Sequence, residues 1–140
     1  MNAKHLLVMA LLAATAVGCG DKTTEPLPPP PPPAPPGSAV VGLVTPNADD
    51  GAVVVTLHGP GISNLATASS GYLFYSRLAS DTVARVMVLG NVSAGPIFTF
   101  KPASGAQASA YQVTIDQVAT RADSMRASLT NYSLTVTAAP

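Results

Sequence analysis

Residues 110–118 read Ala-Tyr-Gln-Val-Thr-Ile-Asp-Gln-Val, which is the clearest two-residue alternation in this chain of 140 residues. Successive side chains of a strand point to opposite faces, so the pattern predicts a strand with one buried and one solvated face. The buried face would hold Tyr111, Val113 and Ile115, with the polar residues between them facing water. One solvated face per strand is typical of antiparallel sheets.

Other short apolar or alternating stretches lie before and after this one, and turns rich in Gly, Pro, Asn and Asp separate them. They predict further strands at residues 39–44, 52–58, 71–76, 82–89, 96–101 and 132–137. The alternation predicts these inward residues: Val53, Val55, Leu57, Val86, Val88, Phe98, Phe100, Leu134 and Val136. Residues 120–128 predict one helical turn or an ordered loop. No long stretch has the 3.6-residue period of a helix. We therefore expect residues 38–140 to form an all-β, antiparallel two-sheet sandwich of seven to nine strands.

Charge and cysteine content exclude several classes of function. The chain has seven Lys and Arg against seven Asp and Glu, so it lacks the basic surface that binds nucleic acid. Its single cysteine lies outside the predicted sandwich, which excludes a disulfide-bearing immunoglobulin domain in the strict sense.

The first 18 residues have the order of a secretory signal. Lys4 is followed by an apolar run at residues 6–17 and then by small residues before Cys19. The run is shorter than the roughly 20 residues that a membrane-spanning helix needs. Residues 1–18 are therefore predicted to be a signal peptide.

The segment Ala16-Val17-Gly18-Cys19 resembles the lipobox of bacterial lipoproteins, with Ala16 where leucine is usual. The resemblance implies cleavage before Cys19, diacylation of its sulfur and a stable membrane anchor, since two acyl chains suffice for one. The alternative is an ordinary secretory signal. Because Gly20 and not an aspartate follows Cys19, analogy with enteric bacteria favours the outer membrane within the cell envelope.

Residues 19–37 link this anchor to the sandwich. Eleven residues from Pro26 to Pro36 are almost all proline, which fixes φ and lacks an amide donor. The segment is predicted to be an extended spacer that holds the domain off the membrane; the alternative is a ligand for a proline-binding module.

Residues 95–118 resemble the later strands of a cohesin module. Ile97-Phe98-Thr99-Phe100-Lys101 has the family's apolar-Phe-x-Phe-Lys pattern, and Tyr111-Gln112-Val113-Thr114-Ile115 has its Tyr-x-Val-Thr-apolar pattern. Residues 47–57 also resemble an early cohesin stretch. The resemblance implies a sandwich of the jelly-roll or immunoglobulin type. It supports this fold more than it supports dockerin binding, because the chain is some tens of residues shorter than a typical cohesin.

Catalytic residues are scarce. His58 is the only histidine after the signal, and no Gly-x-Ser-x-Gly motif accompanies it. We expect His58 to be an exposed strand-end residue, and we expect neither an enzyme nor a cofactor. Zinc is improbable with one histidine. Asn47, Asp49 and Asp50 are weak candidates for a calcium site, and the alternative is turn chemistry alone.

Three aromatic residues, Tyr72, Phe74 and Tyr75, share one predicted strand and are the candidate binding residues. An exposed aromatic pair would suit a sugar or a protein surface. The alternative places Phe74 in the core with Tyr72 half-buried. The sequence thus predicts a lipoprotein that displays a non-catalytic sandwich for protein–protein interaction. The alternatives are a carbohydrate-binding or envelope-assembly module and, less favoured, a calcium-stabilised accessory domain of an envelope enzyme system.

Overall fold

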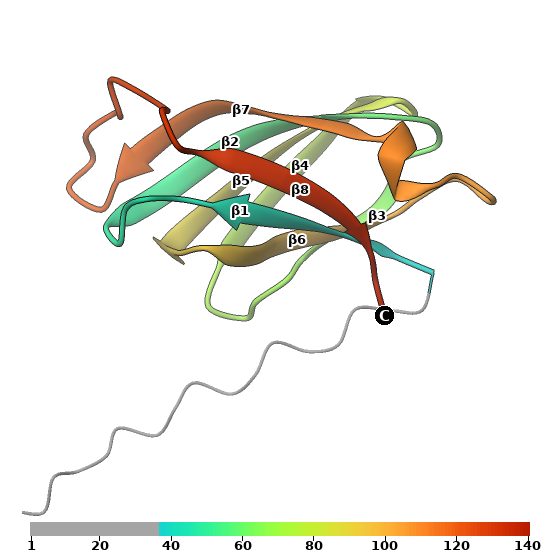
Figure 1. Cartoon of the computed structure of the whole chain (residues 1–140), viewed down its shortest axis with the longest axis horizontal. Coiled ribbons are helices and arrows are strands. Elements are labelled where there is room, and N and C mark those ends of the chain that lie inside the picture. The colour runs from blue at the N-terminus through green and yellow to red at the C-terminus, as the bar shows by residue number, and fades with distance from the viewer. Residues whose placement is uncertain (1–36) are drawn as a thin grey trace, which may run out of the picture.

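The computed structural model describes residues 37–140, which form two antiparallel four-stranded sheets packed face to face (Figure 1). The predicted signal peptide and all but the last residue of the predicted linker lie outside the described residues. The strands are β1 (Ala39–Val44), β2 (Asp50–His58), β3 (Ser63–Thr67), β4 (Leu73–Ser80), β5 (Val83–Val92), β6 (Gly95–Lys101), β7 (Gln112–Thr120) and β8 (Ser133–Ala138). A short 3-10 helix, η1 (Ala108–Ala110), precedes β7. The all-β antiparallel sandwich and its expected strand number are confirmed.

The strand order is β3-β6-β1-β8 in one sheet, called sheet A, and β4-β5-β2-β7 in the other, called sheet B. The inner faces of the two sheets supply the core. In sheet B the predicted inward valines of β2 and β5 are fully buried, and in sheet A so are Phe98 and Phe100. Burial of such side chains stabilises each by roughly 1.5–3 kcal/mol relative to exposure. The predicted alternation of these strands is therefore confirmed.

Residues 112–118 of the predicted stretch lie in β7, which begins two residues later than predicted and continues to Thr120, while Ala110 belongs to η1. The predicted inward residues Tyr111, Val113 and Ile115 do pack on the core. The pairing of β7 with β2 shifts by one residue, because Val55 lies opposite Ile115 while Val54 lies opposite Gln117. This bulge changes the phase of the strand and returns Val118 to the core, where it is 1% exposed.

Strands β3 and β4 differ from the sequence prediction. The strand β3 was not predicted, since its sequence Ser-Asn-Leu-Ala-Thr has no strong apolar alternation; it forms because it pairs with the edge of β6. The strand predicted at residues 71–76 begins later and continues to Ser80, because Leu78 and Ser80 pair with β5 beyond the aromatic stretch. Residues 120–128 were predicted to form one helical turn or an ordered loop. Thr120 ends β7 and the rest lie in an ordered loop at residues 121–132, so the second alternative is confirmed.

The two ends of the sandwich carry different segments. Ala39 lies opposite Ala138, so the chain enters the domain and reaches its C-terminus at the same end (Figure 1). The turn at residues 45–49 and the loop at residues 121–132 lie together at the other end, here called the far end. Within residues 37–140, no helix has the length and apolar character needed to cross a membrane.

Candidate functional site

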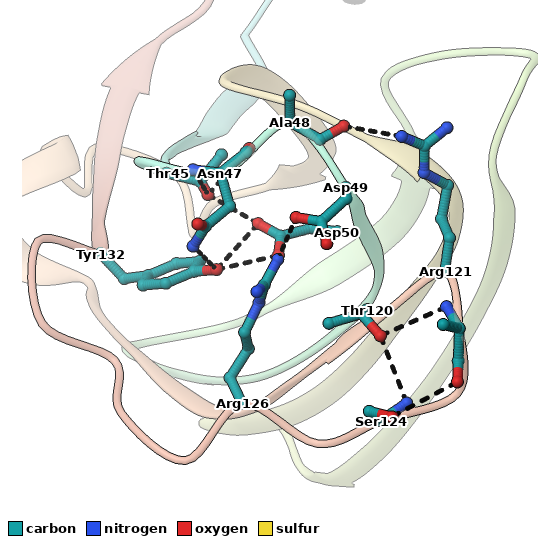
Figure 2. A network of polar contacts seen from close by, with 11 residues as sticks. Thr45, Asn47, Ala48, Asp49, Asp50, Thr120, Arg121, Ser124, Arg126 and Tyr132 are labelled. Carbon is teal, nitrogen blue, oxygen red and sulfur yellow. Dashed lines mark hydrogen bonds and ion pairs between the residues drawn. The ribbon is translucent and has the colours of Figure 1, made fainter.

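A polar network at the far end joins the turn before β2 to the loop after β7 (Figure 2). At its centre is Asp50, which is completely buried. Arg126 donates to Asp50 Oδ1 from Nε at 3.0 Å and from Nη2 at 2.8 Å. Tyr132 donates its hydroxyl to the same oxygen at 2.8 Å, and Thr45 donates to Oδ2 at 2.6 Å. The buried carboxylate is thus fully supplied with donors.

The charges of this network stabilise one another. Arg126 also contacts Asp49, whose carboxylate is 58% exposed. The hydrogen bond from Arg126 holds the pKa of Asp49 below its ordinary value of 3.8. In return, the hydrogen bonds to Asp49 and then to Asp50 raise the pKa of Arg126. Arg126 therefore stays protonated at any working pH.

The three weak calcium candidates occupy this network. Asn47 donates its amide to Tyr132 at 2.7 Å, and both Asp49 and Asp50 face Arg126. The guanidinium of Arg126 therefore occupies the position that a metal ion bound to Asp49 and Asp50 would need. Among the side chains of residues 37–140, no group of three or more His, Cys, Asp or Glu is placed to hold a metal ion. The contacts support a structural role for the turn, and we propose no calcium site.

The three aromatic candidates of β4 and the turn before it do not share one surface. Tyr72 and Phe74 pack against the core, and the Phe74 ring centroid lies 6.2 Å from that of Phe98. Tyr75 points the other way and is 58% exposed. The side chains of Tyr72 and Phe74 therefore contribute to packing, whereas Tyr75 is available to a ligand.

Tyr75 belongs to an exposed apolar surface on the outer face of sheet B, here called the β4–β5 surface and defined by Leu73, Tyr75, Arg77, Arg85 and Met87. A shallow hollow of about 270 Å³ lies between Tyr75, Met87 and Val54, with both arginines on its border. Leu73 is 63% exposed beside it. Exposed apolar clusters rimmed by charge are typical of interaction sites.

Sequence reasoning identified only part of these two clusters. The alternation of their strand predicts that Arg85 and Met87 point outward. It does not indicate that they lie beside Tyr75, because that depends on the pairing of β4 with β5. Arg126 and Tyr132 lie 76 and 82 residues from Asp50, so no spacing in the sequence could pair them with it. His58 is exposed at the end of β2, as predicted.

Comparison of the chain with protein-family models, with curated proteins and with solved structures found no match.

Proposed function

We propose that this protein is a lipoprotein of the cell envelope that displays a small, non-catalytic, cohesin-like sandwich for protein–protein interaction. Cys19 would carry the lipid, the proline-rich segment would act as the spacer, and the outer membrane is the favoured location. The signal sequence and the lipobox support the anchor, and the near-neutral charge argues against a nucleic-acid partner.

The observation that carries the interaction role is the β4–β5 surface. Three of the six large hydrophobic side chains that are exposed in residues 37–140 belong to this surface: Leu73, Tyr75 and Met87. Leaving such side chains in water forgoes burial energy of roughly 25 cal/mol per Å². A protein partner that covers the surface would recover part of that energy.

Site-specific photo-cross-linking in the producing cell tests this proposal. A photoreactive phenylalanine derivative replaces Met87 in the full-length protein, and the matched control replaces Thr135, which is exposed on the outer face of sheet A. We expect a defined protein cross-link from position 87 and none from position 135. Absence of any protein cross-link from position 87, with the protein present at the envelope, would overturn the interaction role.

The anchor is tested separately by Cys19→Ser. We expect the unmodified protein to incorporate a labelled fatty acid in the producing cell and Cys19→Ser to incorporate none. Absence of the label from the unmodified protein, or its persistence in the variant, would contradict lipidation at Cys19.

Carbohydrate binding is the second candidate function, and the exposed Tyr75 ring favours it because sugars stack on aromatic faces. Titration with envelope polysaccharides should then change the tyrosine fluorescence of the protein, and Tyr75→Ala should abolish the change. No change with the unmodified protein would rule out this use of Tyr75.

A further inference from the structure

Strand β4 is an edge strand of sheet B, and no other described strand pairs with its free side. It is eight residues long, and the turn and loop backbone hydrogen bonds of residues 37–140 involve none of its residues. An edge strand presents unpaired N–H and C=O groups, which can pair with another strand. The backbone of β4 is therefore available along one side.

The other edges of the sandwich are less suited to strand addition. β7 is covered near its end, where Arg126 N donates to Val118 O at 2.8 Å and Ala119 pairs with Met125. β3 has only five residues and an irregular register. β8 alternates with Ser and Thr on its exposed side, whereas β4 exposes Leu73 and Tyr75. Among the four edges, β4 combines length, free backbone and apolar side chains.

The outward side chains of β4 continue in rows onto β5. Leu73 lies opposite Leu89 and Tyr75 lies opposite Met87, which gives two apolar rows. Arg77 lies opposite Arg85, which gives a third row that is cationic. A strand added beside β4 would extend these rows, so each row specifies the residue type that fits next to it.

The cationic row is unbalanced. Like charges directly opposite one another in a sheet are destabilising. Arg85 is paired with Asp116 at 3.4 Å, and Thr56 holds that carboxylate with a hydrogen bond of 2.6 Å. No carboxylate of residues 37–140 lies within ion-pair distance of Arg77. A carboxylate on the added strand would therefore complement Arg77.

We propose that β4 binds an extended acidic segment of a protein partner by antiparallel strand addition. The segment would have the pattern acidic-x-apolar-x-apolar, with the acidic residue opposite Arg77 and the apolar residues opposite Tyr75 and Leu73. This inference rests on the proposed interaction role and specifies its site and partner chemistry. A second copy paired about Ser76 would place Tyr75 opposite Arg77 and supply no carboxylate, so the acidic segment fits better.

The test uses the detergent-solubilised full-length protein and the blocked, fluorescently labelled peptide Thr-Glu-Thr-Val-Thr-Val-Thr, with binding followed by anisotropy at low salt. We expect saturable binding that Arg77→Glu weakens roughly tenfold, since reversal turns an ion pair into a repulsion. The same peptide with Lys in place of Glu should bind Arg77→Glu better than it binds the unmodified protein. Lys101→Glu, an equal change of net charge at an exposed position, should bind the original peptide normally.

Backbone pairing is tested with two N-methylated peptides. One set of alternate amides would face β4 and the other would face solvent. We expect methylation of one set to abolish binding and methylation of the other to leave it intact. Equal effects of both sets would overturn strand addition.

Three further results would also overturn the inference. In the first, the original peptide does not bind; in the second, it binds the Arg77→Glu variant as tightly as the unmodified protein. The third result is a stable dimer in sedimentation equilibrium that Arg77→Glu alters, which would identify a second copy as the occupant. The interaction role is judged independently by the cross-link from Met87. A cross-link without peptide binding would retain the surface and reject strand addition, whereas loss of both would reject the two proposals together.

Discussion

Replacing Arg126 with methionine removes the cation beside the buried Asp50 carboxylate while keeping much of the side chain's volume. Asp50 would lose two charged hydrogen bonds, of 2.8 and 3.0 Å, but would keep those from Tyr132 and Thr45. Breaking a buried ion pair from one side costs about 3–5 kcal/mol. The two remaining donors place the expected loss of unfolding free energy near the lower end, at about 3 kcal/mol.

Urea unfolding followed by far-ultraviolet circular dichroism measures this loss. The matched control is Arg121→Met, because Arg121 is exposed in the same loop and its side chain donates to the carbonyl of Ala48. We expect the control to lose less than about 1 kcal/mol. The double variant Asp50→Asn, Arg126→Met should be more stable than the sum of its single changes predicts, since it leaves no unpaired buried charge.

The reasoning would be refuted if Arg126→Met cost no more than Arg121→Met. That result would mean that water or a shift of the loop satisfies Asp50 without the guanidinium. An additive double variant would refute the ion pair as the source of the loss, even if the single variant were unstable.

Four further predictions concern the core, the domain end near the C-terminus, pH and calcium. Phe100→Ala should lower the unfolding free energy by about 3–5 kcal/mol, because Phe100 is fully buried; normal urea unfolding would contradict its place in the core. Tyr111→Phe should cost about 1–3 kcal/mol, because the hydroxyl donates to Pro60 O and accepts from Ala103 N; an unchanged urea midpoint would show that these bonds are dispensable. The pKa of Asp49 is lowered on folding, so ionised Asp49 stabilises the fold above its ordinary value of 3.8, and this contribution is lost as the pH falls through the folded-state pKa. Asp49→Asn should therefore lower the melting temperature at pH 7 but have less effect in strong acid, and an equal effect at both would contradict the linkage. Calcium and its chelators should leave the melting temperature unchanged, since a bound ion would raise it by mass action; a rise with calcium would contradict the arginine-neutralised network.

The sequence predicted the strands whose burial follows from local alternation. Val53, Val55 and Leu57 recur at every second position before the turn at residues 59–61, so their common face could be predicted from the sequence. The same reasoning failed for β3, because an edge strand with little burial carries a weak apolar pattern. It also ended β4 too early, because pairing with β5 continues where the hydrophobic pattern has stopped.

For the surfaces, the sequence indicated residue types but not their neighbours. The alternation showed that Tyr75 and Phe74 lie on opposite faces of one strand, but not which face is exposed. The sequence also left two roles open for Asn47, Asp49 and Asp50, as calcium ligands or as turn residues. Tertiary structure decided both points. Only the packing of sheet A on sheet B shows that Phe74 faces Phe98 and that Tyr75 faces water.

The strand pattern and the proline-rich segment depend only on neighbouring residues, so the sequence by itself determined them. The signal peptide was predicted from the sequence in the same way. The pairing of Asp50 with Arg126, and of Arg77 with Arg85, joins residues from separate segments of the chain. Such contacts depend on strand order and register, which local propensity does not encode. Only the tertiary structure could therefore decide that the buried Asp50 is paired with Arg126 while Arg77, at the edge of sheet B, has no carboxylate partner among residues 37–140.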